Sequence, residues 1–217
     1  MAFFEIFPCL AVGYLFGSLS PSYLISKKKK IDLRKSGTGN FGTSNAIISM
    51  GRAWGAAVMA VDIVKAWVAV KLCQLMFPSL LLGGVIAGSA AVLGHNHPFY
   101  LRFKGGKGVA AFGGFVLAFS WQIFLAMLAV CLAIALVVNY SCMLSFSAAV
   151  IFPFVAVHKL WHDGADTLML LAAFVIISMP MISIAVRHGE NLRRIKLGEE
   201  NKFSFFISKY VLNSKSE

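Results

Sequence analysis

The chain has 217 residues, of which 59% are hydrophobic and only 13% are charged, and its mean hydropathy is +0.78. This composition excludes an ordinary soluble domain and predicts an integral membrane protein. The formal net charge of +11 indicates attraction to anionic lipid headgroups, whereas nucleic acid is not expected as a partner, because no nucleic-acid motif accompanies the basic runs.

Apolar runs of helical length predict about seven transmembrane helices. A hydrocarbon core about 30 Å thick takes roughly 20 helical residues to cross. Three runs come near that length, and four shorter ones need their flanks to become spans: residues 3–25, 54–77 and 168–186, then 80–93, 109–119, 123–138 and 143–157. The run at 109–119 needs the Gly105–Gly108 turn to complete its length. Strands are not expected, because the runs lack the alternation of a membrane barrel.

The basic residues predict how these helices are oriented. With seven spans, all but Lys65, Lys71 and Lys159 of the 20 Lys and Arg residues lie in loops on one side, and positive residues mark the cytoplasmic side. The N-terminus is therefore expected outside and the C-terminus in the cytoplasm. We expect an all-α polytopic membrane protein with a single domain over residues 1–203 and a cytoplasmic tail over 204–217. Glu5 and the lack of a basic leading segment argue against a cleavable signal peptide.

Two charged residues inside the second predicted span form one face of a helix. Asp62 and Lys65 are three residues apart, so we expect them to pair within the bundle in a structural role. The acidic residues otherwise leave a long gap, since no Asp or Glu lies between Asp62 and Asp163. That gap argues against a carboxylate-bound metal, and neither a metal nor a cofactor is expected. The cysteines lack metal-ligand spacing and are expected to be reduced packing residues: Cys9, Cys73, Cys131 and Cys142.

Three loops on the predicted cytoplasmic side carry the residue types of an anion site. The first, residues 36–45, is rich in glycine, hydroxyl and amide groups; the second joins His95 to the FKGGKG stretch at 103–108; the third reads RHGEN at 187–191. Glycines let backbone N–H groups approach a phosphate, and lysines add full charges. Glycine and asparagine also form ordinary turns at membrane borders, but three such loops on one face favour a site for a small polyanion.

The same residues resemble the cytoplasmic motifs of the acyl-phosphate:glycerol-3-phosphate acyltransferase family, often called PlsY. The resemblance covers nearly the whole chain, and its second motif is the most specific. The matching positions are residues 37–42, Ser44 and Asn45 in the first motif; Gly94, His95, Pro98 and residues 103–109 in the second; and Arg187, His188, Glu190, Asn191, Gly198 and Glu200 in the third. The resemblance implies a bacterial cytoplasmic membrane protein whose active site faces the cytoplasm.

The chain also departs from the family pattern. Ile48 stands where the family usually has an arginine associated with substrate phosphate, and Arg52 is a candidate replacement. The family also has an arginine between the histidine and the glutamate of the third motif, and this chain has Gly189 there. This chain also differs from the usual family residue at four further positions: Ser20, Ala66, His97 and Ala111. The sequence therefore resembles a divergent member.

The chemistry that the resemblance implies is transfer of a fatty acyl group from acyl phosphate to the 1-hydroxyl of glycerol 3-phosphate, giving lysophosphatidic acid and phosphate. His95 is expected to accept the hydroxyl proton, with a phosphate oxygen of the substrate as the rival base. Ser44 and Asn191 are expected to act with His95 in catalysis. The residues expected to bind the two substrates are Thr38, Gly39, Asn40, Asn45, Lys104, Gly105, Gly106, Lys107 and His188.

Within that set, the second loop is expected to stabilise the departing phosphate, through Lys104, Lys107 and the Gly105–Gly106 amides. Gly106 is expected to be required because its backbone approaches an anion or takes a positive φ. The acyl chain is expected between helices, in contact with membrane lipids.

Two other functions are compatible with the sequence. A divergent paralogue would acylate or bind another phosphorylated acceptor, and Ile48 keeps that alternative open. A transporter of a phosphorylated metabolite would need polar residues along a path through both leaflets, whereas the polar residues here crowd the predicted inner edge.

Overall fold

The computed structural model describes residues 2–200 and 202–204. Within those residues the chain is helical and contains no strand. The elements are α1 (Ala2–Ser18), α2 (Pro21–Lys28), α3 (Thr43–Met50), α4 (Arg52–Met76), α5 (Gly83–Asn96), the 3-10 helix η1 (Phe99–Leu101), α6 (Val109–Phe119), α7 (Trp121–Val138), α8 (Cys142–His162), α9 (Thr167–Arg187) and α10 (Gly189–Lys196). The all-α prediction is confirmed for these residues, although α3, η1 and α10 lie in segments that the sequence patterns assign to loops.

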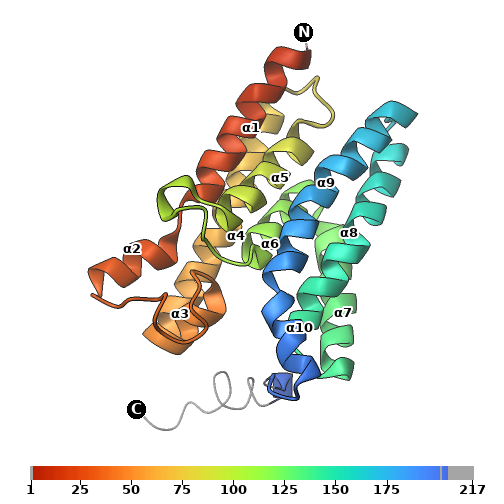
Figure 1. The fold of residues 1–217 in the computed structure, drawn as a ribbon. Coiled ribbons are helices and arrows are strands. Elements are labelled where there is room, and N and C mark those ends of the chain that lie inside the picture. Colours follow the sequence, from red (N-terminus) through yellow and green to blue (C-terminus); the bar gives the residue numbers. More distant parts are fainter. Residues whose placement is uncertain (1, 201, 205–217) are drawn as a thin grey trace.

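The helices form a bundle with two sides. Figure 1 shows α1, α4 and α5 together on one side and α7, α8 and α9 on the other. Helix α6 packs against α4, α5 and α7, and α5 also contacts α9, so both sides are joined through α5 and α6. The short helices α2, α3 and α10 lie at the end of the bundle opposite the N-terminus.

The first predicted span is not one helix. The run at 3–25 breaks between α1 and α2, because Pro21 occupies the first turn of α2 and disfavours a helical residue before it. Ser20 caps the new helix by accepting a hydrogen bond from the Tyr23 N–H at 3.4 Å. Helix α2 consequently leaves the direction of α1 and carries the lysine run aside (Figure 1).

Small residues allow α1 and α5 to pack closely. A methyl group on Gly13 or Gly17 of α1 would collide with backbone atoms of Ala87 or Ala91 on α5. This is the small-residue spacing that brings membrane helices into contact. The approach fixes the C-terminal end of α5, and therefore His95, against α1 and α4.

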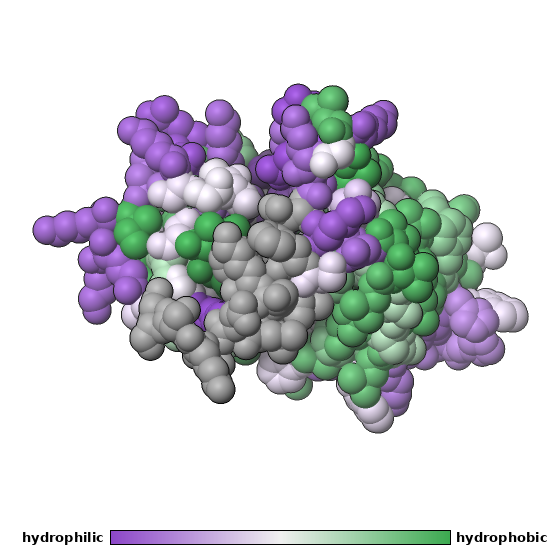
Figure 2. Space-filling model, turned by 90° about the horizontal axis from the view of Figure 1, so that it is seen from below, coloured by the Kyte–Doolittle hydropathy of each residue, from purple (hydrophilic) through white to green (hydrophobic). Residues whose placement is uncertain are grey.

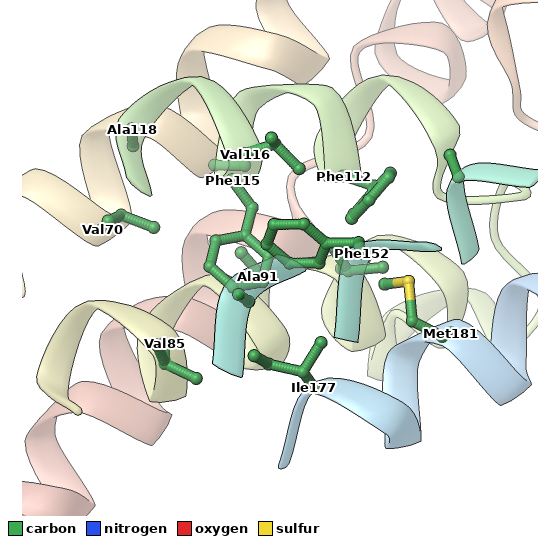
Figure 3. Packing of buried hydrophobic residues seen from close by; sticks show 14 of the residues in the cluster. Val70, Val85, Ala91, Phe112, Phe115, Val116, Ala118, Phe152, Ile177 and Met181 are labelled. Atoms are coloured by element: carbon green, nitrogen blue, oxygen red, sulfur yellow. The ribbon is translucent and has the colours of Figure 1, made fainter. Parts of the chain in front are cut away.

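Aromatic side chains from α6 and α8 fill the centre of the bundle. Phe115 and Phe152 are fully buried and meet edge to face, with ring centroids 5.3 Å apart, and Phe112 packs on Phe152 at 5.1 Å (Figure 3). Gly88 on α5 has no side chain because a Cβ there would collide with the Phe115 ring. Rings packed in this way contribute about 0.5–1.5 kcal/mol per pair beyond their area.

Helix α6 begins and ends where its apolar run does. The Gly105–Gly108 turn does not extend it, contrary to the expected longer span, because Gly108 has φ +87° and forms the N-cap. Ser120 ends it and caps α7 by accepting from the Ile123 N–H at 3.4 Å. With 11 residues, α6 is about 16 Å long at 1.5 Å per residue.

Four helical segments among the described residues are long and apolar enough to cross a membrane: Phe4–Lys28, Trp121–Val138, Cys142–His162 and Thr167–Arg187. Seen from the end that carries α2 and α10, hydrophilic side chains gather beside a broad hydrophobic flank (Figure 2). The four cysteines are buried and free, as predicted. The predicted tail at 204–217 lies outside the described residues except for Ser204, so the domain boundary stays a prediction.

Candidate functional site

The three predicted loops enclose one cavity of about 190 Å³. Thr38 and Asn40 come from the first loop, Lys107 from the second, and Arg187 from the end of α9. Glu190 and Arg194 of α10 complete the lining. The lining thus carries three cationic side chains and one carboxylate. Because Glu200 pairs with Arg194 at 3.0 Å, Lys107 and Arg187 supply the net positive charge, and such a cavity favours an anion. It is smaller than the 300 Å³ or more of a typical drug-sized pocket, which suits a small polar ligand.

Lys107 supplies a charge that no carboxylate of the described residues contacts directly. Its Nζ donates to the Asn191 Oδ1 at 2.5 Å, and the Asn191 Nδ2 donates in turn to the Glu200 Oε1 at 2.7 Å. Burial lowers the pKa of the Lys107 ammonium below its usual value, and the Glu200 carboxylate acts against this shift. The neutral amide between them orients Lys107 and leaves its positive charge available to a ligand.

Arg187 joins α9 to the second loop and keeps one donor unused. Its Nη2 donates to the Phe103 carbonyl at 3.1 Å, and its Nη1 reaches the Gly105 carbonyl at 3.5 Å. Its Nε is buried and has no hydrogen-bond partner among the described residues. A buried donor without a partner costs about 1–3 kcal/mol; Arg187 itself lines the cavity, so its guanidinium charge is close to any anion that binds there.

Asn45 holds the first loop in place, and its side chain is not available for the predicted contact with substrate. Asn45 is fully buried. Its Oδ1 accepts from the Thr38 N–H at 2.8 Å, and its Nδ2 donates to the carbonyls of Leu33 and Asn40 at 2.9 and 2.7 Å. These bonds use both polar atoms of the side chain, so Asn45 orders the loop that presents Thr38 and Asn40.

The glycine amides of the second loop also point inward, which corrects the expected cradle. The Gly105 N–H donates to the Asn96 carbonyl at 3.0 Å, and the Gly106 N–H to the His95 carbonyl at 3.2 Å. Both donors are therefore occupied by the protein. The Lys104 side chain is exposed and is not among the cavity-lining residues. What remains beside Lys107 is the N-terminus of α6, whose first-turn amides have no acceptor within the helix.

His95 belongs to a buried ionic cluster behind that loop. The Asp62 Oδ1 lies 2.7 Å from the Lys65 Nζ and 3.2 Å from the His95 Nδ1, which confirms the predicted Asp62–Lys65 pair. Lys65 also donates to the Leu19 carbonyl at the end of α1. The other ring nitrogen of His95 lies against Gly106, where a Cβ would collide with it. His95 is not among the residues that line the cavity.

The structure shows a different constraint on Gly106 from those expected. Its φ is not positive, whereas that of Gly108 is. Its backbone packs against the His95 ring. The close packing of glycine on imidazole fixes the depth of the loop that carries Lys107.

Three more predicted residues take other places. His188 is buried, its Nδ1 donates to the Ile184 carbonyl at 2.8 Å, and burial lowers its pKa to about 4. It is therefore a neutral packing residue beside the site. Ser44 is exposed at the start of α3 and outside the lining, and Gly39 shapes the first loop through a left-handed φ of +71°.

Ile48, at the departure from the family pattern, is 38% exposed on α3 and close to Gly37. An arginine in its place would stand beside the first loop. Arg52, at the start of α4, is not part of the lining. The cavity contains Arg187 and Arg194 instead.

Sequence reasoning missed the roles of Arg187, Glu190 and Arg194 in the lining. For two of them the spacing carried a signal, since Glu190 and Arg194 are four residues apart and so share one face of α10. The chain was expected to form a loop there, so this face was not considered.

The family profile described as "Glycerol-3-phosphate acyltransferase" matches residues 7–198. Proteins of that name from Thermosipho melanesiensis and Lactiplantibacillus plantarum are 35% and 34% identical, over 88% and 93% of this chain and 89% and 93% of their own. A crystal structure of PlsY, an integral membrane glycerol 3-phosphate acyltransferase, in its glycerol 3-phosphate form has a TM-score of 0.75 and 32% identity, over 93% of this chain and 95% of that one. Its lysophosphatidic acid form has a TM-score of 0.72 and 31% identity, over 93% and 94%.

Proposed function

The chain belongs to the glycerol-3-phosphate acyltransferase family, and we propose that the cavity formed by its three loops holds the phosphate of glycerol 3-phosphate next to the acyl donor. The protein is a membrane acyltransferase that acts on glycerol 3-phosphate in phospholipid biosynthesis. The observation that carries the site assignment is the group of Lys107, Arg187 and Arg194 around one cavity.

We infer that the acyl donor is an acyl phosphate. In the proposed reaction, the 1-hydroxyl oxygen of glycerol 3-phosphate forms a bond to the acyl carbonyl carbon. The bond between that carbon and the phosphate oxygen breaks, and its electron pair leaves with inorganic phosphate. Lys107 and the N-terminus of α6 stabilise the charge that develops on the leaving oxygen. Arg187 and Arg194 position the phosphate of glycerol 3-phosphate and compensate for the absence of an arginine at position 48, where this chain has Ile48.

The proton acceptor has two candidates, His95 and a phosphate oxygen of the substrates. The His95 Nδ1 is engaged with Asp62 and Lys65, its other nitrogen is covered by Gly106, and the residue is only 7% exposed. A general base needs to be within hydrogen-bond reach of the proton that it removes. We therefore favour the phosphate oxygen as acceptor and a positioning role for His95.

Purified protein is expected to release inorganic phosphate from acyl phosphate only when glycerol 3-phosphate is present. Release that depends equally well on a different phosphorylated alcohol would support the divergent paralogue. Movement of labelled glycerol 3-phosphate into sealed vesicles, without phosphate release, would support the transporter.

The proposed membrane orientation has seven spans, with the N-terminus outside and the site facing the cytoplasm of a bacterial inner membrane. Three features support it. The first is that the cationic α2, the second loop and α10 lie at the same end of the bundle. The second is that four helical segments are long and apolar enough to span, and the third is that the family includes an integral membrane protein. In this arrangement α4, α5 and α6 complete the set of spans, with α6 reaching only part of the way.

Cysteine labelling tests the orientation. A cysteine that replaces Lys28, Arg102 or Arg193 is expected to be protected from an impermeant thiol reagent added outside intact cells, whereas one that replaces Asp163 is expected to react. The native cysteines are buried, so background labelling is low. Labelling at Arg102 from outside would contradict the proposed span count.

A further inference from the structure

A second cavity, of about 420 Å³, lies at the other end of the bundle from the three loops. It is an open cavity between α4, α6, α7 and α8, and its polar and aromatic lining consists of Trp67, Lys71, Phe119, Ser120, Trp121, Gln122 and Lys159. Lys159 is in the last turn of α8, just before the chain returns through α9 towards Arg187. The reaction proposed above uses none of these residues.

The short helix α6 explains why a cavity forms there. Its last turn and the Ser120 connection form the floor, at the level of Lys71 on α4. Helix α4 continues for five residues beyond Lys71, which is about 7.5 Å at 1.5 Å per residue. The polar turn between α6 and α7 is therefore set below the end of α4.

The charge in this cavity is positive. The Lys71 Nζ donates to the Gln74 Oε1 at 3.1 Å, which leaves its charge uncompensated by that partner. The Lys159 Nζ contacts the Asp163 carboxylate at 2.7 Å and lies 5.8 Å from the centre of the Phe119 ring. Asp166, the next carboxylate along the chain, is used to cap α9. The N-terminus of α7, capped by Ser120, adds free amides and the positive end of a helix dipole.

The surroundings are those of a membrane border. Trp67 and Trp121 are 40% and 58% exposed, and tryptophan is typical of the headgroup level. Below them, α7 exposes Leu125, Leu128 and Leu132 at helical spacing. A ligand in the cavity therefore meets cations at one end and an apolar helix face at the other, which matches a phospholipid better than a soluble anion.

We propose that this cavity binds an anionic phospholipid from the leaflet opposite the acyltransferase site, with the headgroup phosphate between Lys71 and Lys159 and the acyl chains along α7. The proposal depends on the helices spanning the membrane and not on the reaction. An acidic lipid in this position would fill the hollow above α6, the shortest of the proposed spans, and link α4 to α8.

Tryptophan fluorescence gives a direct test. A protein in which Trp54 and Trp161 are replaced by Phe keeps only Trp67 and Trp121, both in the cavity. It is reconstituted in phosphatidylcholine vesicles that contain a minor amount of brominated phosphatidylglycerol or, as the reference, brominated phosphatidylcholine. We expect the anionic lipid to be at least about fivefold more effective as a quencher, because a lysine near the surface adds substantial attraction for an anionic lipid.

Charge variants in the same background decide whether the cavity causes that preference. The Lys71→Gln Lys159→Gln variant is expected to lose it. The Lys27→Gln Lys28→Gln variant, which removes two charges from α2 instead, is expected to keep it. Asp163→Asn frees Lys159 and is expected to increase it. Equal quenching by both lipids in the parent, or a preference that survives without Lys71 and Lys159, would overturn the proposal whether or not the protein has acyltransferase activity.

Discussion

Replacing Lys107 by glutamine is expected to lower kcat/KM about 10²- to 10³-fold, the usual cost of removing one group that stabilises developing charge. Lys107 lines the cavity and is held by Asn191 rather than by a carboxylate. Its positive charge is therefore available to the phosphates of the proposed substrates. Glutamine keeps a hydrogen-bond donor for Asn191 but removes that charge. Steady-state phosphate release, at equal amounts of folded protein, gives the value.

The matched control is Lys28→Gln. Lys28 is exposed at the end of α2, so its replacement removes one cytoplasmic-side charge and weakens headgroup attraction by a similar amount, about 1 kcal/mol. It does not alter the cavity. We expect nearly normal activity from this variant, and equal activity of the two variants would refute the role of Lys107.

The second large effect is expected for Gly106→Ala. A Cβ at this position would collide with the His95 ring, and that ring is fixed from behind by Asp62 and Lys65. The loop must then move outward and carry Lys107 with it. A displacement of about 1 Å can cost 10²-fold in rate, so we expect a loss of about that size in kcat. Gly113→Ala is the control, because its new methyl group would meet only the Phe124 ring edge at 3.7 Å; full activity of Gly106→Ala would contradict the packing argument.

His95 variants separate its two possible roles. If His95 only positions the loop, removing the ring relieves the collision, and the double variant His95→Ala Gly106→Ala should be more active than the two single losses combined would predict. In His95→Gln, the fall of kcat/KM at low pH (the acidic limb of the profile) should persist, because the phosphate oxygen still accepts the proton. If the limb disappears and His95→Ala loses at least about a hundredfold in rate with substrate binding intact, His95 is the base.

The sequence predicted the parts of the structure that depend on hydrophobic length and on charge. Helix α6 coincides with its apolar run, and the Asp62–Lys65 pair follows from helical spacing. The break between α1 and α2 was missed, because the apolar run continues through it and only Ser20 and Pro21 mark it. The seven-span orientation stays a prediction until cysteine labelling tests it.

Residue types were less informative about which way each group faces. Asn45 and the Gly105–Gly106 amides have the chemistry of an anion site, yet the protein itself occupies them. Such partners lie elsewhere along the chain, and spacing alone cannot show them. Arg194, in contrast, lines the cavity although it was not predicted to. It reaches the cavity only because α10 forms where a loop was expected.

The central claim is that this chain moves an acyl group from acyl phosphate to glycerol 3-phosphate at the cavity between its three loops. The most direct measurement follows both products, with purified protein, labelled glycerol 3-phosphate and acyl phosphate. We expect lysophosphatidic acid and inorganic phosphate to appear in equal amounts, and both to fall together in Lys107→Gln. Phosphate release that does not require glycerol 3-phosphate, or that continues without any lysophosphatidic acid, would contradict the account.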